Sequence, residues 1–311
     1  MIIRKYEKIF KNEWNNFVNK AKNGHFFFNR DFMEYHSNKF QDFSLIIFDD
    51  NDKILSILPA NIKENTLYSH QGLTFGGFVT NERTNVASML GFFKLLKIYL
   101  HSNNISRMVY KAIPYIYHSM PAEEDRYALF VYNAKLIKKE VSSTILLQRQ
   151  IGYTKGRKWT VNKAKKENLK VEKSLDFKNF WVVLEDVLRF RHNASPVHTI
   201  DEIERLATLF PENIKLYIIK IDEEIIAGTI IFENANIVHT QYMANSDYGK
   251  KIGALDLLID YLIKDVYKNK IYFDFGISTE EDGKILNKGL IEQKEGFGAR
   301  AVVHDCYELN L

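Results

Sequence analysis

The 311-residue sequence is poor in cysteine, with Cys306 as its single one. One cysteine excludes an internal disulfide framework, and it fits a reducing compartment such as the cytoplasm. We expect Cys306 to be a small hydrophobe near the last strand, because free cysteines are usually buried. Thiol catalysis is therefore not expected.

Long apolar runs are absent as well. Nowhere do about 18 uncharged apolar residues follow one another, which a helix needs to cross a bilayer. Charged residues such as Arg4, Lys5 and Glu7 interrupt the N-terminus, so the sequence predicts no signal peptide. We expect a soluble, cytoplasmic protein without a transmembrane segment, for which peripheral membrane contact stays open.

A large charge of one sign is also missing. The net charge is +4 and the pI is near 8.8. This is modest for a protein that binds duplex DNA, so no DNA partner is expected, but it is compatible with a ligand that bears phosphates. Hydrophobic residues make up 46% of the chain, which is enough to fill two cores of about 150 residues each.

What is present is an order of elements that occurs twice. In the first half a hairpin is predicted over residues 43–62, a helix over 85–101 and a strand over 108–110. In the second half a hairpin covers 216–232, and a strand (237–243), a helix (252–267) and a strand (271–275) follow. The repetition predicts an α+β fold of two similar domains, 1–149 and 150–311, each a mixed, largely antiparallel sheet flanked by helices.

Between these halves lies the densest charge. Residues 155–173 carry eight cations against Glu167 and Glu172, with Trp159 among them. The cations are Lys155, Arg157, Lys158, Lys163, Lys165, Lys166, Lys170 and Lys173. The segment is either a solvated helix face or a platform for phosphates of a nucleotide sugar, a coenzyme, a lipid carrier or an RNA.

Two strands of the second half carry the candidate chemistry. Asp274 interrupts an apolar strand, where an unpaired carboxylate would be costly, so it needs a partner or a function. We expect Asp274, Glu280 and Lys294 to converge, with an ion pair between strand and helix as one possible outcome. His239 is either a core histidine with satisfied hydrogen bonds or a base that takes a proton from an attacking amine.

The neighbours of His239 are candidates for substrate binding. Strand alternation predicts His239 and Gln241 on one face, with Thr240 and Tyr242 on the other. His198 either lines the same cleft or belongs to a loop that caps the following helix. The histidines lack the spacing of a metal site, so no metal is expected. A Gly-x-Ser-x-Gly elbow, which would favour a hydrolase, is absent.

Three segments carry a resemblance to a known family. Residues 245–254, Asn-Ser-Asp-Tyr-Gly-Lys-Lys-Ile-Gly-Ala, lie between a predicted strand and a helix and resemble the pyrophosphate loop of GNAT acyltransferases. Together with Tyr-Phe-Asp-Phe-Gly at 272–276 and Lys-Glu-Gly-Phe-Gly at 294–298, they resemble the FemAB-like branch, whose members contain two tandem GNAT domains. The resemblance implies two GNAT-like domains, with the donor site in the second.

The resemblance also implies which residues hold the donor. Acyl-CoA, such as acetyl-CoA, would bind through its phosphates to Gly249, Lys250, Lys251, Ile252, Gly253 and Ala254. Lys250 stands where acyl-CoA enzymes usually carry Gln or Arg, and Leu255 stands where they carry Gly or Ala. The heptads of the coiled-coil arm of Fem-type aminoacyltransferases are absent. The donor stays open between acyl-CoA, acyl carrier protein and aminoacyl-tRNA.

The function implied is transfer of an acetyl, other acyl or aminoacyl group to the amine of an amino sugar or nucleotide-linked sugar in cell-surface polysaccharide biosynthesis. The catalytic candidates are His239, Asp274, Glu280 and Lys294. Lys294 would either stabilise negative charge on the acyl oxygen or hold an acceptor phosphate, and Asp274 or Glu280 would bind the sugar amine. The substrate-binding candidates are Arg191, His198, Gln241, Tyr242 and Asn287. The alternatives are an aminoacyl-tRNA-dependent Fem-type aminoacyltransferase acting on a peptidoglycan precursor, and a non-catalytic nucleotide-sugar or carbohydrate-binding module.

Overall fold

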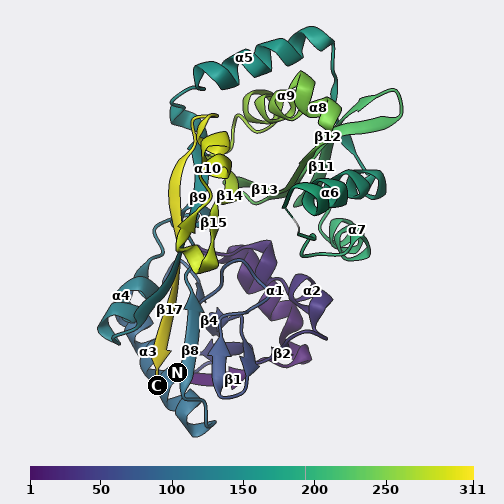
Figure 1. The fold of residues 1–311 in the computed structure, drawn as a ribbon. Coiled ribbons are helices and arrows are strands. Elements are labelled where there is room, and N and C mark those ends of the chain that lie inside the picture. Colours follow the sequence, from purple (N-terminus) through teal and green to yellow (C-terminus); the bar gives the residue numbers. More distant parts are fainter. Residues whose placement is uncertain (193) are drawn as a thin grey trace. The chain divides into compact units, whose positions relative to one another are not determined.

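The computed structural model describes residues 1–192 and 194–311, and the side chains of residues 191 and 192 also lie outside the described part. The chain forms two compact units (Figure 1). Unit 1 consists of Met1–Glu140, Glu281–Ile285 and Val303–Leu311, and unit 2 of Val141–Glu280 and Leu286–Val302. Two long strands, β9 (Lys135–Leu146) and β17 (Arg300–Asn310), contribute residues to both units.

Unit 1 is built on one antiparallel sheet and one mixed sheet. Its helices are α1 (Lys11–Lys20), α2 (Arg30–Met33), α3 (Val86–Ser102) and α4 (Glu124–Val131). Its strands are β1 (Ile2–Lys5), β2 (Gln41–Asp42), β3 (Leu45–Phe48), β4 (Ile54–Leu58), β5 (Asn61–Lys63), β6 (Thr66–Tyr68), β7 (Val79–Thr80) and β8 (Arg107–Lys111). One sheet has the order β1-β3-β4-β7, and the other has the order β17-β8-β6-β5-β2 with β6 and β8 parallel.

The core of unit 1 gathers around α3. Asn85 caps this helix by accepting a hydrogen bond from the Ser88 amide. The helix then buries Met89, Phe92, Phe93, Leu96 and Leu100, which recur every three or four residues. The predicted hairpin and the predicted helix at 85–101 are both confirmed.

Unit 2 carries a sheet with helices on both faces. Its helices are α5 (Lys155–Ala164), α6 (Phe177–His192), α7 (Ile200–Leu209), α8 (Asp247–Ile252), α9 (Ala254–Tyr261) and α10 (Lys288–Glu295). Its strands are β10 (Val171–Ser174), β11 (Ile214–Ile221), β12 (Glu224–Glu233), β13 (Ile237–Asn245), β14 (Tyr272–Ile277) and β15 (Thr279–Glu280), and β16 (Ile285–Leu286) ends in it. The order is β10-β11-β12-β13-β14-β9, antiparallel except between β13 and β14.

The two faces of this sheet have different coverings. On one face α9 packs its apolar side chains against Ile231, Val238 and Phe273. On the other face lies α6, whose Phe180 packs so closely on Gly228 that a Cβ there would come within 2.6 Å of the ring. The predicted mixed, largely antiparallel sheet flanked by helices is confirmed.

The compact units divide at other places than residues 149 and 150. The residues after Val302 return to unit 1, where Cys306 pairs with Lys111 of β8. Pairing between strands about 200 residues apart is set by long-range contacts, which a local pattern does not contain. The proposal that residues 1–149 form a GNAT-like domain of their own therefore stays a prediction.

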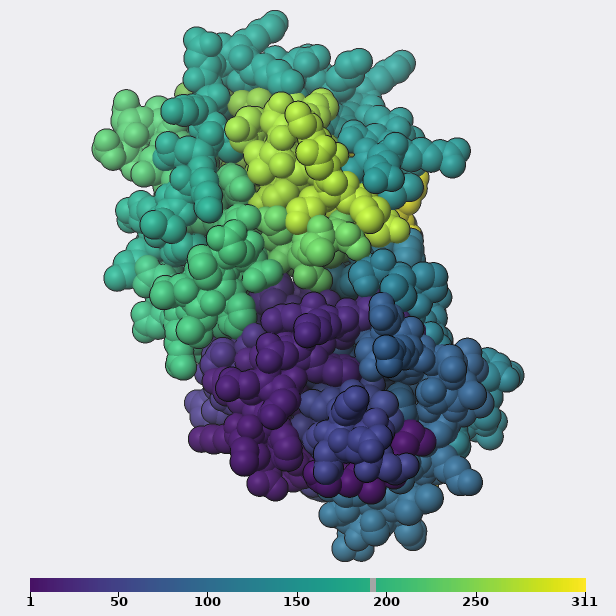
Figure 2. Space-filling view, turned by 180° about the vertical axis from the view of Figure 1, so that it is seen from behind, coloured from purple at the N-terminus to yellow at the C-terminus, as the bar shows by residue number. Residues whose placement is uncertain are grey.

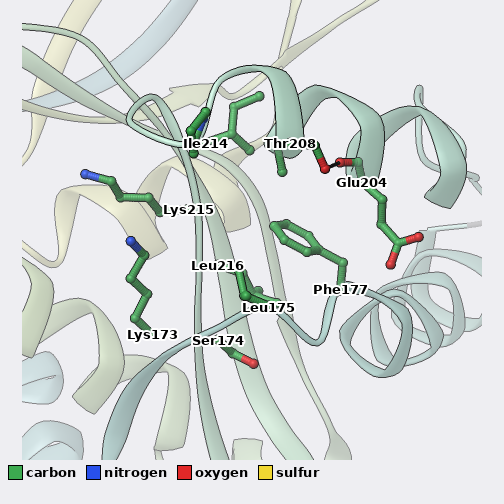
Figure 3. A pocket seen from close by; sticks show the side chains of 11 residues that line it. Lys173, Ser174, Leu175, Phe177, Glu204, Thr208, Ile214, Lys215 and Leu216 are labelled. Carbon is green, nitrogen blue, oxygen red and sulfur yellow. Dashed lines mark hydrogen bonds between the residues drawn. The ribbon is translucent and has the colours of Figure 1, made fainter.

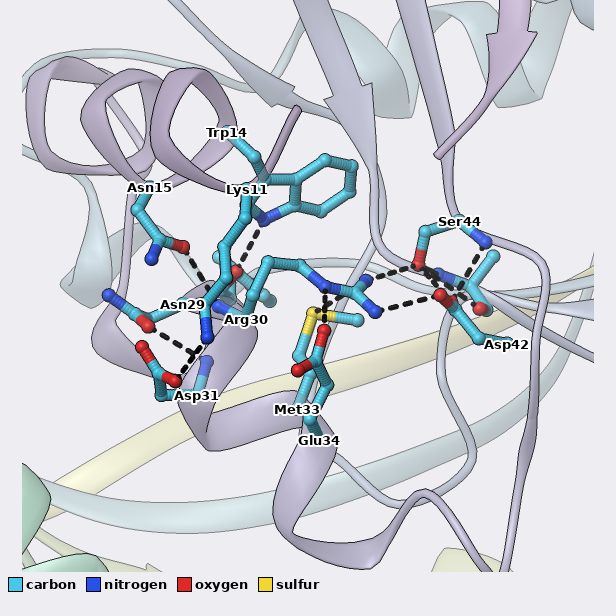
Figure 4. Close-up of polar contacts among 12 residues, drawn as sticks. Lys11, Trp14, Asn15, Asn29, Arg30, Asp31, Met33, Glu34, Asp42 and Ser44 are labelled. Atoms are coloured by element: carbon cyan, nitrogen blue, oxygen red, sulfur yellow. Dashed lines mark hydrogen bonds and ion pairs between the residues drawn. The ribbon is translucent and has the colours of Figure 1, made fainter. Parts of the chain in front are cut away.

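A buried arginine organises the N-terminal part of unit 1 (Figure 4). Arg30 is 3% exposed, and its guanidinium donates to Asp42 Oδ2 (2.7 Å), Ser44 Oγ (3.1 Å) and Glu34 Oε1 (3.1 Å). The guanidinium carbon also lies 3.8 Å from the ring centroid of Tyr6. These contacts fix the short helix α2 to the strand that follows.

We expect Arg30→Met to lower the free energy of unfolding by about 1–3 kcal/mol, because the buried Ser44 hydroxyl and the part-buried carboxylates of Asp42 and Glu34 lose a charged donor. Arg4→Met is the matched control, since Arg4 pairs with Asp52 at the surface, and we expect it to cost at most about 1 kcal/mol. Denaturant unfolding followed by circular dichroism measures both. Equal effects of the two substitutions would contradict the structural role of Arg30.

Candidate active site

The candidate site lies where two parallel strands of unit 2 separate. Residues 237–239 of β13 pair with residues 272–274 of β14, and the pairing ends at His239 opposite Asp274. Beyond this point β13 continues along β12. Because partners in register point to the same face of a sheet, the two side chains meet at the point of separation.

Asp274 is fully buried and accepts hydrogen bonds at both oxygens. Its Oδ1 accepts from Ser142 Oγ (2.5 Å) and Thr144 Oγ1 (2.6 Å). Its Oδ2 accepts from His239 Nδ1 (2.7 Å) and the Gly276 amide (3.2 Å). Burial alone would raise the pKa of the carboxyl, but the bonds from His239, Ser142 and Thr144 hold it at about 2. Asp274 is therefore a carboxylate at neutral pH.

His239 is oriented by this carboxylate. Its side chain is 16% exposed. Since a carboxylate only accepts hydrogen bonds, Nδ1 carries the proton of the neutral ring and Nε2 keeps a lone pair. Gly276 packs beside the ring, with a φ of +77° that favours glycine, and a Cβ there would come within 3.0 Å of Cε1. In its neutral form the imidazole can therefore accept a proton at Nε2.

Lys294 holds the end of the same strand. It comes from α10, is 3% exposed, and donates from Nζ to the carbonyls of Gly276 (2.9 Å) and Ile277 (2.6 Å). Burial lowers the pKa of Lys294 to about 8, while the charge of Asp274 acts in the opposite direction. Lys294 thus ties α10 to the backbone just after Asp274, and the ion pair between strand and helix stays a prediction. The predicted role of Lys294 at the acyl oxygen stays a prediction.

Glu280 and Asn287 form a separate contact. Asn287 caps α10 by accepting from the Leu290 amide (3.0 Å), and its Nδ2 donates to Glu280 Oε1 (2.8 Å). Asn287 is therefore engaged in the start of the helix, and Glu280, which is exposed, bonds to the cap. Of the predicted catalytic group, the structure brings together Asp274 and His239 directly and Lys294 through the backbone.

The predicted alternation along β13 is wrong at Gln241. Opposite β12 the register shifts between Ile230 and Ile231, so that Thr240 lies opposite Ile231 and Tyr242 lies opposite Ile230. Gln241 is the extra residue of a β-bulge. Tyr242 consequently falls on the same face as His239, which an unbroken alternation would not allow.

Tyr242 anchors a second polar contact on this face. Its hydroxyl lies 2.7 Å from Nδ1 of His198, which is buried, and its ring packs edge-on against Trp181 of α6 at 5.3 Å. His198 thus joins the sheet, while Thr199 caps α7. Arg191 belongs to α6, but its predicted contact with substrate falls on a side chain outside the described residues.

The predicted phosphate loop forms the corner between α8 and α9. Gly253 has a φ of +81°, and a Cβ there would come within 2.7 Å of Thr160 Cγ2 of α5. The Lys251 carbonyl accepts from Lys163 of the same helix (2.8 Å). In the first turn of α9, where a phosphate would be attracted, Asp256 pairs with Arg157.

The other members of the loop are also engaged in the fold. The Gly249 amide donates to Ser246 Oγ (3.0 Å), and a Cβ on Gly249 would meet the Ile226 carbonyl at 2.4 Å. Ile252 and Ala254 are buried. Lys250 is exposed. These residues are engaged by α5 and by the fold, and the predicted binding of the coenzyme A diphosphate at this corner stays a prediction.

A pocket elsewhere in unit 2 has a volume of about 440 Å³ (Figure 3). Its lining includes Phe177 at the start of α6 and Thr208 of α7, and Figure 3 shows the amines of Lys173 and Lys215 at one end. The Lys215 amine is bonded to Glu233 (2.7 Å). None of the lining residues belongs to the His239–Asp274 site. In the described part of the chain, no group of three or more His, Cys, Asp or Glu residues could hold a metal ion.

Residues 162–282, which include His239 and Asp274, match the family model described as acetyltransferase (GNAT) domain. The chain contains a GNAT acetyltransferase domain. Its activity class is acyl transfer of the GNAT type. No curated protein matches the sequence. Among the described residues, no helix is both long and apolar enough to cross a bilayer.

Solved structures extend the likeness of fold beyond the GNAT domain. FemX shares 11% identity at a TM-score of 0.72, with 100% of this chain and 98% of that one covered. The C-terminal domain of a protein designated a lysylphosphatidylglycerol synthetase from Agrobacterium fabrum shares 11% identity at a TM-score of 0.61, with coverage of 96% and 91%. L-PGS from Bacillus licheniformis shares 12% identity at a TM-score of 0.58, with coverage of 86% and 84%. The fold is the FemAB-like GNAT fold.

We expect Lys294→Met to lower the free energy of unfolding by about 1–3 kcal/mol, because the carbonyls of Gly276 and Ile277 lose the buried charged donor that holds them. Turnover below the melting temperature should stay within tenfold of wild type. Lys288→Met, an exposed position in the same helix, is the control and should change neither quantity. A fall in turnover of about 10²- to 10³-fold without a melting shift would instead assign Lys294 to the acyl oxygen.

Acid should weaken unit 2 through Asp274. Its folded pKa of about 2 lies below the ordinary value of 3.8, so its stabilising effect is complete above about pH 4 and is lost as the pH falls toward 2. The difference corresponds to roughly 2 kcal/mol. We expect the drop in melting temperature between pH 4 and 2 to be smaller in Asp274→Asn than in the exposed control Asp50→Asn. An equal drop in melting temperature in the two variants would contradict the stabilising role of the Asp274 carboxylate.

Proposed function

We propose that unit 2 transfers an acyl group from an activated donor to an amine, with His239 as the base that removes the proton of the amine. The observation that carries the proposal is the His239–Asp274 pair at the point where β13 and β14 separate, within the GNAT domain. Deprotonation matters because an amine is largely an ammonium ion at neutral pH, and only the free amine attacks a carbonyl.

The chemistry follows from the hydrogen bonds of the pair. Nε2 of His239 takes a proton from the ammonium, and the free amine attacks the carbonyl carbon of the donor. Asp274 stabilises the imidazolium that forms, because its charge is fixed at neutral pH by the low pKa of the carboxyl. As the carbonyl re-forms, the bond to the leaving group breaks, and the leaving group takes the second proton of the attacking nitrogen. No bond between the enzyme and the acyl group is needed, so donor and acceptor are bound together.

We propose an amino sugar or nucleotide-linked sugar of cell-surface polysaccharide biosynthesis as the acceptor, and the cytoplasm as the compartment. Support comes from the face that carries His239, where Tyr242, His198 and Trp181 combine aromatic rings with polar groups. Such a combination suits a sugar, which offers hydroxyls at its edge and C–H groups on its faces. Gln241, at the bulge, adds an amide to this part of the strand.

A second candidate is transfer of an aminoacyl group from aminoacyl-tRNA. The observation in its favour is the α8–α9 corner, whose residues are committed to α5. The likeness of fold to FemX agrees with this candidate. Comparing transfer from acetyl-CoA and from aminoacyl-tRNA, with and without ribonuclease treatment of the donor, separates the two candidates. Product formation is followed by mass spectrometry.

We expect His239→Gln to lower turnover by about 10²- to 10⁴-fold with the fold intact by circular dichroism, because glutamine cannot accept the proton. His101→Gln, an exposed position in α3, serves as the control and should keep the rate. Full activity of His239→Gln would make His239 a structural residue and remove the main support of the proposal.

A further inference from the structure

The helix α5 is fixed to unit 2 by its inner face. Val161 and Ala164 are buried, and Arg157 lies 4.4 Å from the centroid of Phe297. Arg157 also pairs with Asp256, and Lys165, just after the helix, pairs with Asp260 at 2.8 Å. The inward cations of this segment are thus neutralised by carboxylates of α9.

The outer face of α5 is different. It carries Lys155, Lys158, Trp159 and Asn162, and Lys166 follows in the 3₁₀ turn after the helix; all five are exposed. The spacing of the residues from Lys155 to Asn162 places them on one side of the helix, over a length of about 10 Å at 1.5 Å per residue. Figure 1 shows α5 along an edge of unit 2 beside α9, and in Figure 2 the teal side chains of this region project from the surface of the unit.

The charge of this outer face is not compensated. In the part of the chain that the structure describes, the side-chain amines of Lys155, Lys158 and Lys166 make neither hydrogen bonds nor ion pairs, although the backbone amide of Lys158 donates to the Thr154 carbonyl within the helix. Glu167 is the only acidic residue between 155 and 171. Trp159 is 66% exposed, whereas the other two tryptophans, Trp14 and Trp181, are buried. A large exposed ring within a row of lysines is an unusual surface for a solvated helix.

We propose that the outer face of α5 binds single-stranded RNA, with the lysines on phosphates and a base stacked on Trp159. Lysines along a line neutralise successive phosphates, and an exposed aromatic ring accepts an unpaired base. A membrane surface fits less well, because a helix that lies in the interface needs an apolar face, and Trp159 is the one large apolar side chain of this face. RNA binding is independent of the group that unit 2 transfers.

The test measures the affinity of the full chain for a labelled 12-nucleotide RNA of mixed sequence by fluorescence anisotropy. Trp159→Ala should weaken binding by about 5- to 150-fold, which corresponds to the loss of one stacked base. Trp159→Phe, which keeps an aromatic ring, should restore most of the affinity. Because Trp14 and Trp181 are buried, the RNA should also quench the fluorescence of the wild-type protein through Trp159.

Charge is tested by a triple variant, Lys155→Gln with Lys158→Gln and Lys166→Gln. It should lower the slope of log affinity against log salt by about 2, since each phosphate contact on a single strand contributes about 0.7. The matched control replaces three exposed lysines of unit 1, Lys63, Lys94 and Lys135, by Gln. It removes the same net charge and should bind RNA like wild type.

Three outcomes would overturn the proposal. Equal losses of RNA affinity in the two triple variants would show that RNA binds through net charge alone. Unchanged affinity in the α5 variant would show that RNA does not bind to the outer face of α5. Binding of vesicles with 30% anionic lipid, lost in the α5 variant, without RNA binding would assign the face to a membrane. His239→Gln should bind RNA normally, so failure of the acyl-transfer proposal can be told apart from failure of this one.

Discussion

The buried carboxylate of Asp274 is the constraint on which the site in unit 2 depends. A charge without exposure to water is stable only with donors around it, and Asp274 receives them from two neighbouring strands and from its own backbone. Ser142 and Thr144 lie two residues apart on β9, so the strand period delivers both hydroxyls to the same oxygen. The other oxygen is left for His239. Orientation of the imidazole and stability of the strand pair thus have one origin.

The sequence indicated the members of this site better than their arrangement. Asp274 stood out because a carboxylate in an apolar strand is costly, and His239 stood out as a titratable group on a strand. Their contact depends on the parallel register of β13 and β14. These two strands are separated along the chain by helices, so no local pattern contains the register. Ser142 and Thr144 were missed, although a run of three hydroxyl residues between Val141 and Ile145, inside a predicted strand, is a readable signal.

Other features could not be predicted from local pattern. The bulge at Gln241 exists only in relation to β12, so alternation along β13 gave the wrong face for Tyr242. The corner at Gly253 resembled a phosphate loop in sequence, yet α5, almost a hundred residues earlier, packs on it. The elements themselves were predictable, because hairpins, α3 and the apolar strands have strong periods of their own. The residues that form a turn or a strand are neighbours in the sequence, whereas the residues that pack on it come from distant parts of the chain.

The strand β17 has a consequence for how the protein is made. Residues 306–310 pair with β8, so the sheet of unit 1 is completed by a segment that leaves the ribosome after all of unit 2. Until then β8 presents an open edge of unpaired amides and carbonyls to other chains. Unit 1 therefore cannot reach its final state during synthesis ahead of unit 2, as an N-terminal domain usually does. Chaperone dependence and a tendency to aggregate should concentrate in this interval.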